Sequence, residues 1–160
     1  MDKQIRSRVS LLNPVHFLAF GFGSGLAAKM PGTFGTLAAL PLVVLLSLYT
    51  SFSTYLIVTI MVSIVGIWIC GKAADDMGVH DDSSIVWDEV AGMLITMLAV
   101  PLSWQTLLVG FVLFRFFDII KPWPISYLDK HVHGGFGIMI DDVLAGLFAL
   151  GILHFGLYLI

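Results

Sequence analysis

Charged side chains are scarce in this chain of 160 residues, where they make up only 12% of the sequence. A soluble globular domain carries roughly a quarter charged residues, so the composition excludes an ordinary soluble domain. Hydrophobic residues account for 58% of the chain, and the mean hydropathy is +0.97. The composition therefore predicts a protein whose helices are surrounded by lipid.

Cysteine pairs and basic runs are also missing. The one cysteine, Cys70, lies in an apolar stretch and has no partner for a disulfide. The formal net charge is −3 and no stretch is rich in lysine or arginine, so we expect no nucleic-acid partner. The length fits one domain, which we expect to span residues 1–160.

The chain has long apolar segments instead. A helix needs about 20 residues to cross the bilayer core, and several segments are shorter, so we expect short or tilted spans. The stretch Val15–Ala28 is interrupted by glycines, which favours an N-terminal interfacial or re-entrant helix. We therefore expect an all-α polytopic helical membrane protein with about five membrane segments. These are Thr36–Tyr49, Thr54–Gly71, Val86–Leu102, Trp104–Phe117 and Ile138–Ile160.

Basic residues fall on one side if the chain crosses the membrane at each of these segments. The opposite loops, Thr50–Ser53 and Leu102–Ser103, carry no charge. The positive-inside rule then places the N-terminus and the charged loops in the cytoplasm. The basic residues on that side are Lys3, Arg6, Arg8, Lys72, Lys121 and Lys130.

Acidic residues gather on the same predicted side. Every acid except Asp2 lies in one of two regions, Asp75 to Glu89 and Asp118 to Asp142. Charge is costly in lipid, so ionisable groups at membrane helices are functional candidates. No role is predicted for Asp75, Asp76, Asp81 and Asp82, and Lys72 offers the first two a purely structural partner.

Two pairs of adjacent acids open apolar segments, Asp88-Glu89 and Asp141-Asp142. Acids in a first helical turn interact favourably with the helix dipole, so a structural explanation stays open. If the two helix starts meet, however, the converging carboxylates cannot all stay ionised without a cation. Hard oxygen ligands suit Mg²⁺ or Mn²⁺, so we expect these four acids to bind Mg²⁺, with Asp88 and Asp142 also catalytic.

A predicted phosphate clamp follows the fourth apolar segment. Arg115, Asp118 and Lys121 are spaced i, i+3, i+6, which places them on one face of a helix. They could form a simple ion-pair ladder. In the functional interpretation, Arg115 and Lys121 bind the substrate phosphate beside a catalytic acid, Asp118, that joins the metal.

Further candidates flank the first and last long segments. In the stretch from Lys29 to Thr36, a glycine turn opens a helix and exposes its backbone N–H groups. Lys29 adds positive charge, and Thr33 and Thr36 can cap the helix. Together these features predict a site that can bind an anion. The same Pro-Gly pattern also occurs in ordinary turns. His133 is a candidate proton donor to a leaving alkoxide, although surface histidines are common.

Several of these stretches, taken in order, resemble the phosphatidylglycerophosphatase A family of Gram-negative bacteria. The matching blocks span the chain from about Asn13 to Gly146. They are Gly21–Leu26, Pro31–Thr36, Asp76–Asp81, Ile85–Glu89, Lys121–Ile125 and Val132–Asp142.

The resemblance implies an all-helical, multi-pass enzyme of the bacterial inner (cytoplasmic) membrane. It would remove the terminal phosphate from phosphatidylglycerophosphate, with Mg²⁺ as cofactor, and leave phosphatidylglycerol in the bilayer. The charge bias of the loops would place its active site on the cytoplasmic face. Direct attack by water and a phosphoenzyme formed on an aspartate both stay open.

Other functions can be weighed against the residues. Histidine-nucleophile lipid phosphatases need the tetrapeptide Pro-Ser-Gly-His, and the CDP-alcohol phosphotransferases need a signature that starts Asp-Gly-x-x-Ala-Arg; the chain contains neither. A cation transporter that uses the carboxylates as an ion pathway is the alternative. Its acids should continue past the middle of the membrane. In this chain, the parts of the predicted membrane segments on the side opposite the charged loops carry no charge.

Overall fold

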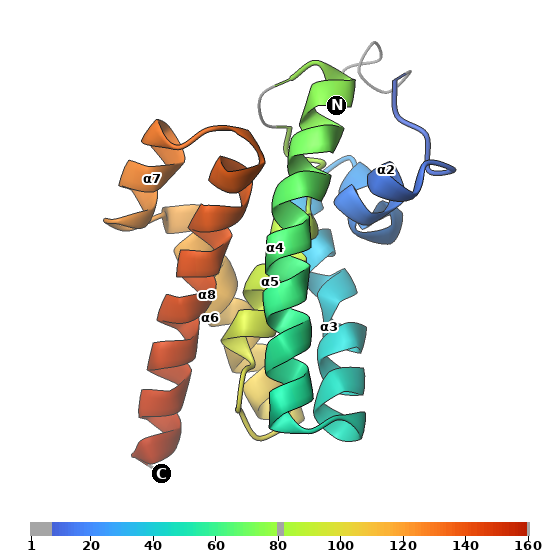
Figure 1. Cartoon of the computed structure of the whole chain (residues 1–160). Coiled ribbons are helices and arrows are strands. Elements are labelled where there is room, and N and C mark those ends of the chain that lie inside the picture. Colours follow the sequence, from blue (N-terminus) through green and yellow to red (C-terminus); the bar gives the residue numbers. More distant parts are fainter. Residues whose placement is uncertain (1–7, 80–81, 160) are drawn as a thin grey trace.

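Every regular element in the computed structural model is a helix, which confirms the all-α prediction for the residues described, 8–79 and 82–159 (Figure 1). The helices are α2 (Pro14–Ala19), η1 (Gly21–Leu26), α3 (Pro31–Tyr49), α4 (Phe52–Met77), α5 (Trp87–Thr96), α6 (Trp104–Ile120), α7 (Ile125–His131) and α8 (Gly134–Tyr158). Five residues named above, Asp2, Lys3, Arg6, Asp81 and Ile160, lie outside this range.

Short polar turns connect the long helices. The hydroxyl of Ser51 caps α4, and Ser103 with Thr106 forms a reciprocal capping box at the start of α6. At its other end α4 stops at Gly78, whose φ of 70° is the left-handed conformation that commonly ends a helix. The α3 and α4 helices run in opposite directions, α6 runs in the same direction as α4, and α8 runs opposite to α6 (Figure 1).

Within the described residues, three helices are long and apolar enough to cross a membrane: α3, α4 and α8. The predicted count of about five is not confirmed. The α6 helix has 17 residues, and α5 has only 10 where Val86–Leu102 was expected to form one segment. Ten residues rise only about 15 Å, half of a bilayer core, so α5 alone is too short to cross.

The α5 helix forms the centre of the molecule. Nine of its ten residues are buried, and it packs against α3, α4, α6 and α8. After α5 the chain continues without a helix to the end of the molecule where α3 and α4 are joined (Figure 1). The outer helices instead expose large apolar side chains such as Ile64, Trp68, Val112 and Phe155, as expected of surfaces that face lipid.

The stretch Val15–Ala28 forms two short helices, α2 and η1, with a kink at Phe22 and Gly23, whose φ angles are 61° and 96°. Neither helix is a candidate span, and a position in the interface stays a prediction. The α2 helix packs against the C-terminal end of α4, where His16 Nε2 lies 3.2 Å from Asp76 Oδ2. Lys72 also pairs with Asp76, which supports the structural explanation for that acid.

Candidate metal and phosphate site

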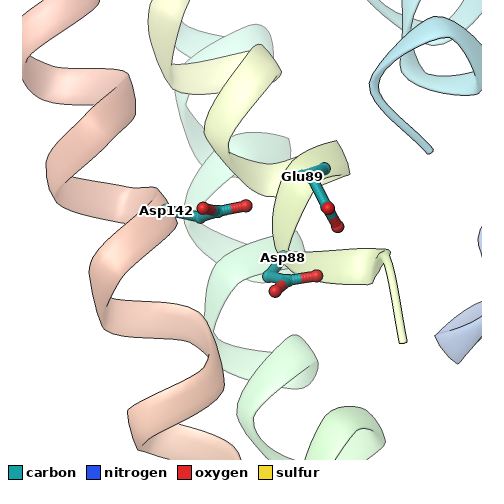
Figure 2. Close-up of side chains that lie close together, drawn as sticks. All are labelled: Asp88, Glu89 and Asp142. Atoms are coloured by element: carbon teal, nitrogen blue, oxygen red, sulfur yellow. The ribbon is translucent and has the colours of Figure 1, made fainter. Parts of the chain in front are cut away.

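Three carboxylates converge between α5 and α8 (Figure 2). Asp88 and Glu89 project from the first turn of α5, and Asp142 projects from α8. One oxygen atom from each residue lies within 4.8 Å of the other two. These three acids belong to the set predicted to bind a metal, and they come from segments more than fifty residues apart in the sequence.

The cluster is buried and leaves carboxylate oxygens without partners. Glu89 is 8% exposed and Asp142 is 2% exposed. Among the described residues, the buried oxygens that accept no hydrogen bond are Asp88 Oδ1, Glu89 Oε2, Asp141 Oδ1 and Asp142 Oδ2. An unsatisfied buried polar group costs about 1–3 kcal/mol, and more if it is charged, so these oxygens need a ligand.

Burial and the nearby Asp142 carboxylate both disfavour the charged form of Glu89. A cation between the acids would relieve both effects. The donor set consists entirely of hard carboxylate oxygens, which fits Mg²⁺ or Mn²⁺ better than a softer metal.

Two glycines let α5 and α8 approach closely beneath the acids. Gly92 follows Asp88 by four residues, and Gly146 follows Asp142 by four, so each glycine lies one turn below its acid on the same helix face. A Cβ atom added at Gly146 would lie 2.6 Å from the carbonyl oxygen of Gly92. The helix crossing at these glycines therefore sets the spacing of the carboxylates.

The position of Asp141 and Asp142 differs from the prediction. The last helix was expected to begin at Ile138, with the acids opening it, but α8 begins at Gly134, whose φ of 73° turns the chain into the helix. The two acids therefore lie two turns inside α8. Because the helix dipole acts mainly within the first turn, it explains neither of them, although it remains available to Asp88 and Glu89.

Arg115 connects the acids of α5 to those of α6. Its Nη1 atom lies 3.5 Å from Glu89 Oε1, and the same nitrogen pairs with Asp118. The Arg115 side chain is 15% exposed. It is thus a nearly buried cation beside the carboxylate cluster, as a phosphate-binding residue would be.

Lys121 does not continue the ion-pair ladder to Asp118. Its Nζ atom lies 2.5 Å from Asp129 Oδ1 and 2.5 Å from Asp141 Oδ2. Burial lowers the pKa of Lys121, but the hydrogen bonds to these carboxylates outweigh it and raise the pKa above its ordinary value. Asp141 therefore has one oxygen engaged by a lysine, and it is not part of the group of three acids.

A cavity of about 300 Å³ lies over these groups. Most of the predicted site residues line it: Asp88, Glu89, Arg115, Asp118, Lys121, Asp141 and Asp142. The cavity thus combines five acids with two cations at one end of the helical bundle. That arrangement can hold a divalent cation and a phosphate group side by side.

Four other predicted residues do not line this cavity, and their roles stay predictions. Lys29 is exposed and Thr33 is half-buried. The hydroxyl of Thr36 donates to the Gly32 carbonyl oxygen at 2.9 Å within its own helix. His133 is exposed at the N-cap of α8, about 13 Å along the helix axis from Asp142.

Gly32 is a site residue that the sequence interpretation did not single out. A Cβ atom there would lie 2.2 Å from Glu89 Oε1 and 3.0 Å from Arg115 Nη1. Only glycine lets the first turn of α3 contact this ion pair. The signal was the Pro-Gly pair at the helix start, which is also typical of ordinary turns.

A family model and two known proteins that match this chain all point to the same family. A family model described as phosphatidylglycerophosphatase A matches residues 17–157. Phosphatidylglycerophosphatase A of Escherichia coli (strain K12) is 50% identical over 151 residues, which cover 94% of this chain and 87% of the relative. The protein of the same name from Haemophilus influenzae (strain ATCC 51907 / DSM 11121 / KW20 / Rd) is 53% identical over 144 residues, covering 89% and 88%.

No solved structure matches the chain significantly. The resemblance of the acidic and glycine-containing blocks is nevertheless confirmed by sequence over nearly the whole length. Because the family model and both relatives cover most of its residues, this chain belongs to the phosphatidylglycerophosphatase A family.

Proposed function

We propose that this chain hydrolyses phosphatidylglycerophosphate to phosphatidylglycerol and inorganic phosphate, with Mg²⁺ held by Asp88, Glu89 and Asp142. Membership of a phosphatase family supports the reaction and the lipid. The observation that carries the metal assignment is the convergence of these three acids, each with a buried oxygen that has no partner. The enzyme would act at the cytoplasmic face of the bacterial inner membrane.

The protein side chains around the cation have separable tasks. When bound, Mg²⁺ would supply positive charge to the phosphate oxygens and act as a Lewis acid. Arg115, aligned by Glu89 and Asp118, offers a planar fork of N–H donors to the same phosphate. Lys121 is held by two carboxylates at the rim and adds a point charge.

The cation-transporter alternative receives no support from the structure. In the described residues the carboxylate cluster lies at one end of the bundle, and no acid follows Asp142 along the rest of α8. A transport pathway would need polar groups farther along the membrane.

Phosphate release by the purified protein in detergent tests the proposal. We expect release from phosphatidylglycerophosphate in Mg²⁺, none after EDTA treatment and dialysis, and slower release from phosphatidic acid and lysophosphatidic acid. Full activity in excess EDTA would contradict the metal assignment. Equal rates on all three lipids would contradict selection of the glycerophosphate headgroup.

A further inference from the structure

The rim of the cavity carries two exposed apolar side chains beside its charged interior. Met30, just before α3, and Ile119, near the end of α6, are each 64% exposed. Both line the same cavity as Arg115 and Asp142. A polar cavity with an apolar rim suits a ligand that has a charged end and a hydrocarbon end.

The rim lies between two helices that make few contacts with each other. The α3 helix packs mainly on α5, and α6 packs mainly on α8. Met30 adopts a φ of 51°, a left-handed conformation that is uncommon for a residue other than glycine. Such backbone strain clusters at ligand-binding sites, and here it sits where α3 begins.

An apolar track leads away from each side of the rim. On α3, Met30 is followed at helical spacing by Phe34 and Leu37, which are 49% and 43% exposed. On α6, Ile119 is preceded at helical spacing by Phe116 and Val112, which are 52% and 55% exposed. Each track runs from the cavity rim along a helix into the apolar part of the bundle.

We propose that the diacylglycerol part of the lipid substrate leaves the cavity between Met30 and Ile119, with its acyl chains lying along these two tracks. The inference rests on the proposed function, because it takes the cavity to hold the terminal phosphate. The substrate tail is the expected occupant because it is covalently joined to the phosphate in the cavity. A phosphate bound between Arg115 and the acids is attached to a tail that must stay in hydrocarbon, and the rim is where the cavity borders lipid-facing side chains.

We call this exit path between Met30 and Ile119 the portal. The dependence of activity on acyl-chain length tests it in matched variants. Met30→Gln and Ile119→Gln place an amide at the rim at nearly constant size. Ile120→Gln is the control, because Ile120 is 57% exposed on the same turn but does not line the cavity. The substrates are phosphatidylglycerophosphates with palmitoyl chains and with short, water-soluble hexanoyl chains, both assayed in the same detergent.

We expect the rim variants to lose about tenfold in kcat/KM on the palmitoyl lipid, mainly through KM, and to match the parent on the hexanoyl lipid. The control should match the parent on both. An equal loss on both lipids, no loss on either, or a similar loss in the control would overturn the portal. If the parent hydrolyses neither lipid, the proposed function itself fails.

A photoreactive lipid separates the substrate tail from other occupants. Phosphatidylglycerophosphate and phosphatidylcholine that carry a diazirine in one acyl chain are each crosslinked to the parent protein. We expect only the first to label peptides that contain Met30–Leu37 and Val112–Ile119 selectively. Equal labelling by both probes would indicate bulk lipid, and a dimer that dissociates when Ile119 is substituted would indicate a second copy. Either result would overturn the proposal.

Discussion

At the scale of single residues, the buried acid Asp142 gives the sharpest test of the metal assignment. It lies two turns inside α8, where dipole compensation does not operate, and one of its oxygens has no partner. We expect Asp142→Asn to lower turnover about a hundredfold or more, because it removes a charged ligand worth roughly 3–4 kcal/mol of barrier. Phosphate release in saturating Mg²⁺ measures the loss.

Thermal unfolding of the same variant in detergent separates chemistry from folding. In EDTA, Asp142→Asn should unfold at a temperature no lower than the parent, because without the metal it removes a buried charge rather than a satisfied contact. Asp75→Asn is the control, since Asp75 is exposed at the end of α4. Turnover of Asp142→Asn close to that of the parent would refute its catalytic assignment.

Lys121 allows a prediction about pH. Its pKa is raised in the folded state, so the stability that it contributes is fully present below the ordinary lysine pKa of about 10.4 and is lost only as pH rises through the higher folded value. We therefore expect Lys121→Met to lower the free energy of unfolding by about 1–3 kcal/mol, equally at about pH 7 and about pH 9.

Denaturation of the detergent-solubilised protein at the two pH values provides the measurement. The exposed residue Lys130 supplies the control variant Lys130→Met, which should change stability little at either pH. A loss at Lys121 that disappears at about pH 9 would show that its charge is not held by the two carboxylates.

At the scale of helices, the crossing of α5 and α8 at Gly92 and Gly146 controls the site. Gly146→Ala would place a methyl group 2.6 Å from the Gly92 carbonyl oxygen, so the helices must separate. We expect about 1–3 kcal/mol of destabilisation and a higher Mg²⁺ concentration for half-maximal activity, because the three acids move apart. Mg²⁺-dependent thermal stabilisation gives the same information without turnover.

Gly151→Ala is the matched control for that change. Gly151 lies on the same helix, and a Cβ atom there meets nothing within 4 Å. It should be neutral or slightly stabilising, because alanine favours the helix more than glycine does. If Gly146→Ala leaves the Mg²⁺ dependence unchanged, the crossing does not set the spacing of the acids.

Helices also show what the sequence could and could not predict. The acid pairs were found because charge beside apolar segments is rare, and three of these acids do converge. The start of α8 was misplaced because Gly134, Gly135 and Gly137 look like a loop, whereas Gly135 allows a close approach to Ile67 and Gly137 a close approach to Val132. That reason is tertiary packing, and local propensity contains no information about it.

The choice of partners was likewise beyond the sequence. Helical spacing placed Arg115, Asp118 and Lys121 on one face and left a simple ion-pair ladder open, but Lys121 pairs with acids of α7 and α8 instead. Spacing identifies residues on one face of a helix, and only the fold decides which other helix meets that face.

At the scale of the whole molecule, the direction of the chain in the membrane is testable with two cysteines on one helix. Ser53 and Asp75 are exposed near opposite ends of α4, 22 residues or about 33 Å apart, which exceeds the bilayer core. We expect a membrane-impermeant maleimide added to intact cells to label Ser53→Cys and not Asp75→Cys.

The native Cys70 is buried and gives little background in this experiment. Permeabilised cells should label both positions, which serves as the positive control. Labelling of Asp75→Cys alone in intact cells would invert the topology, and labelling of both would mean that α4 does not span the membrane.

The depth of the acids inside α8 has a consequence for selectivity. Asp142 lies about 12 Å along α8 from Gly134, so the carboxylate cluster lies below the level at which that helix begins. A lipid anchored by its tails has its phosphate held near that level, whereas free glycerol phosphate must give up bulk water with nothing to hold it there. The fold therefore selects substrates whose phosphate is held at this level by membrane-embedded tails. We expect it to reject soluble phosphomonoesters that have the right headgroup.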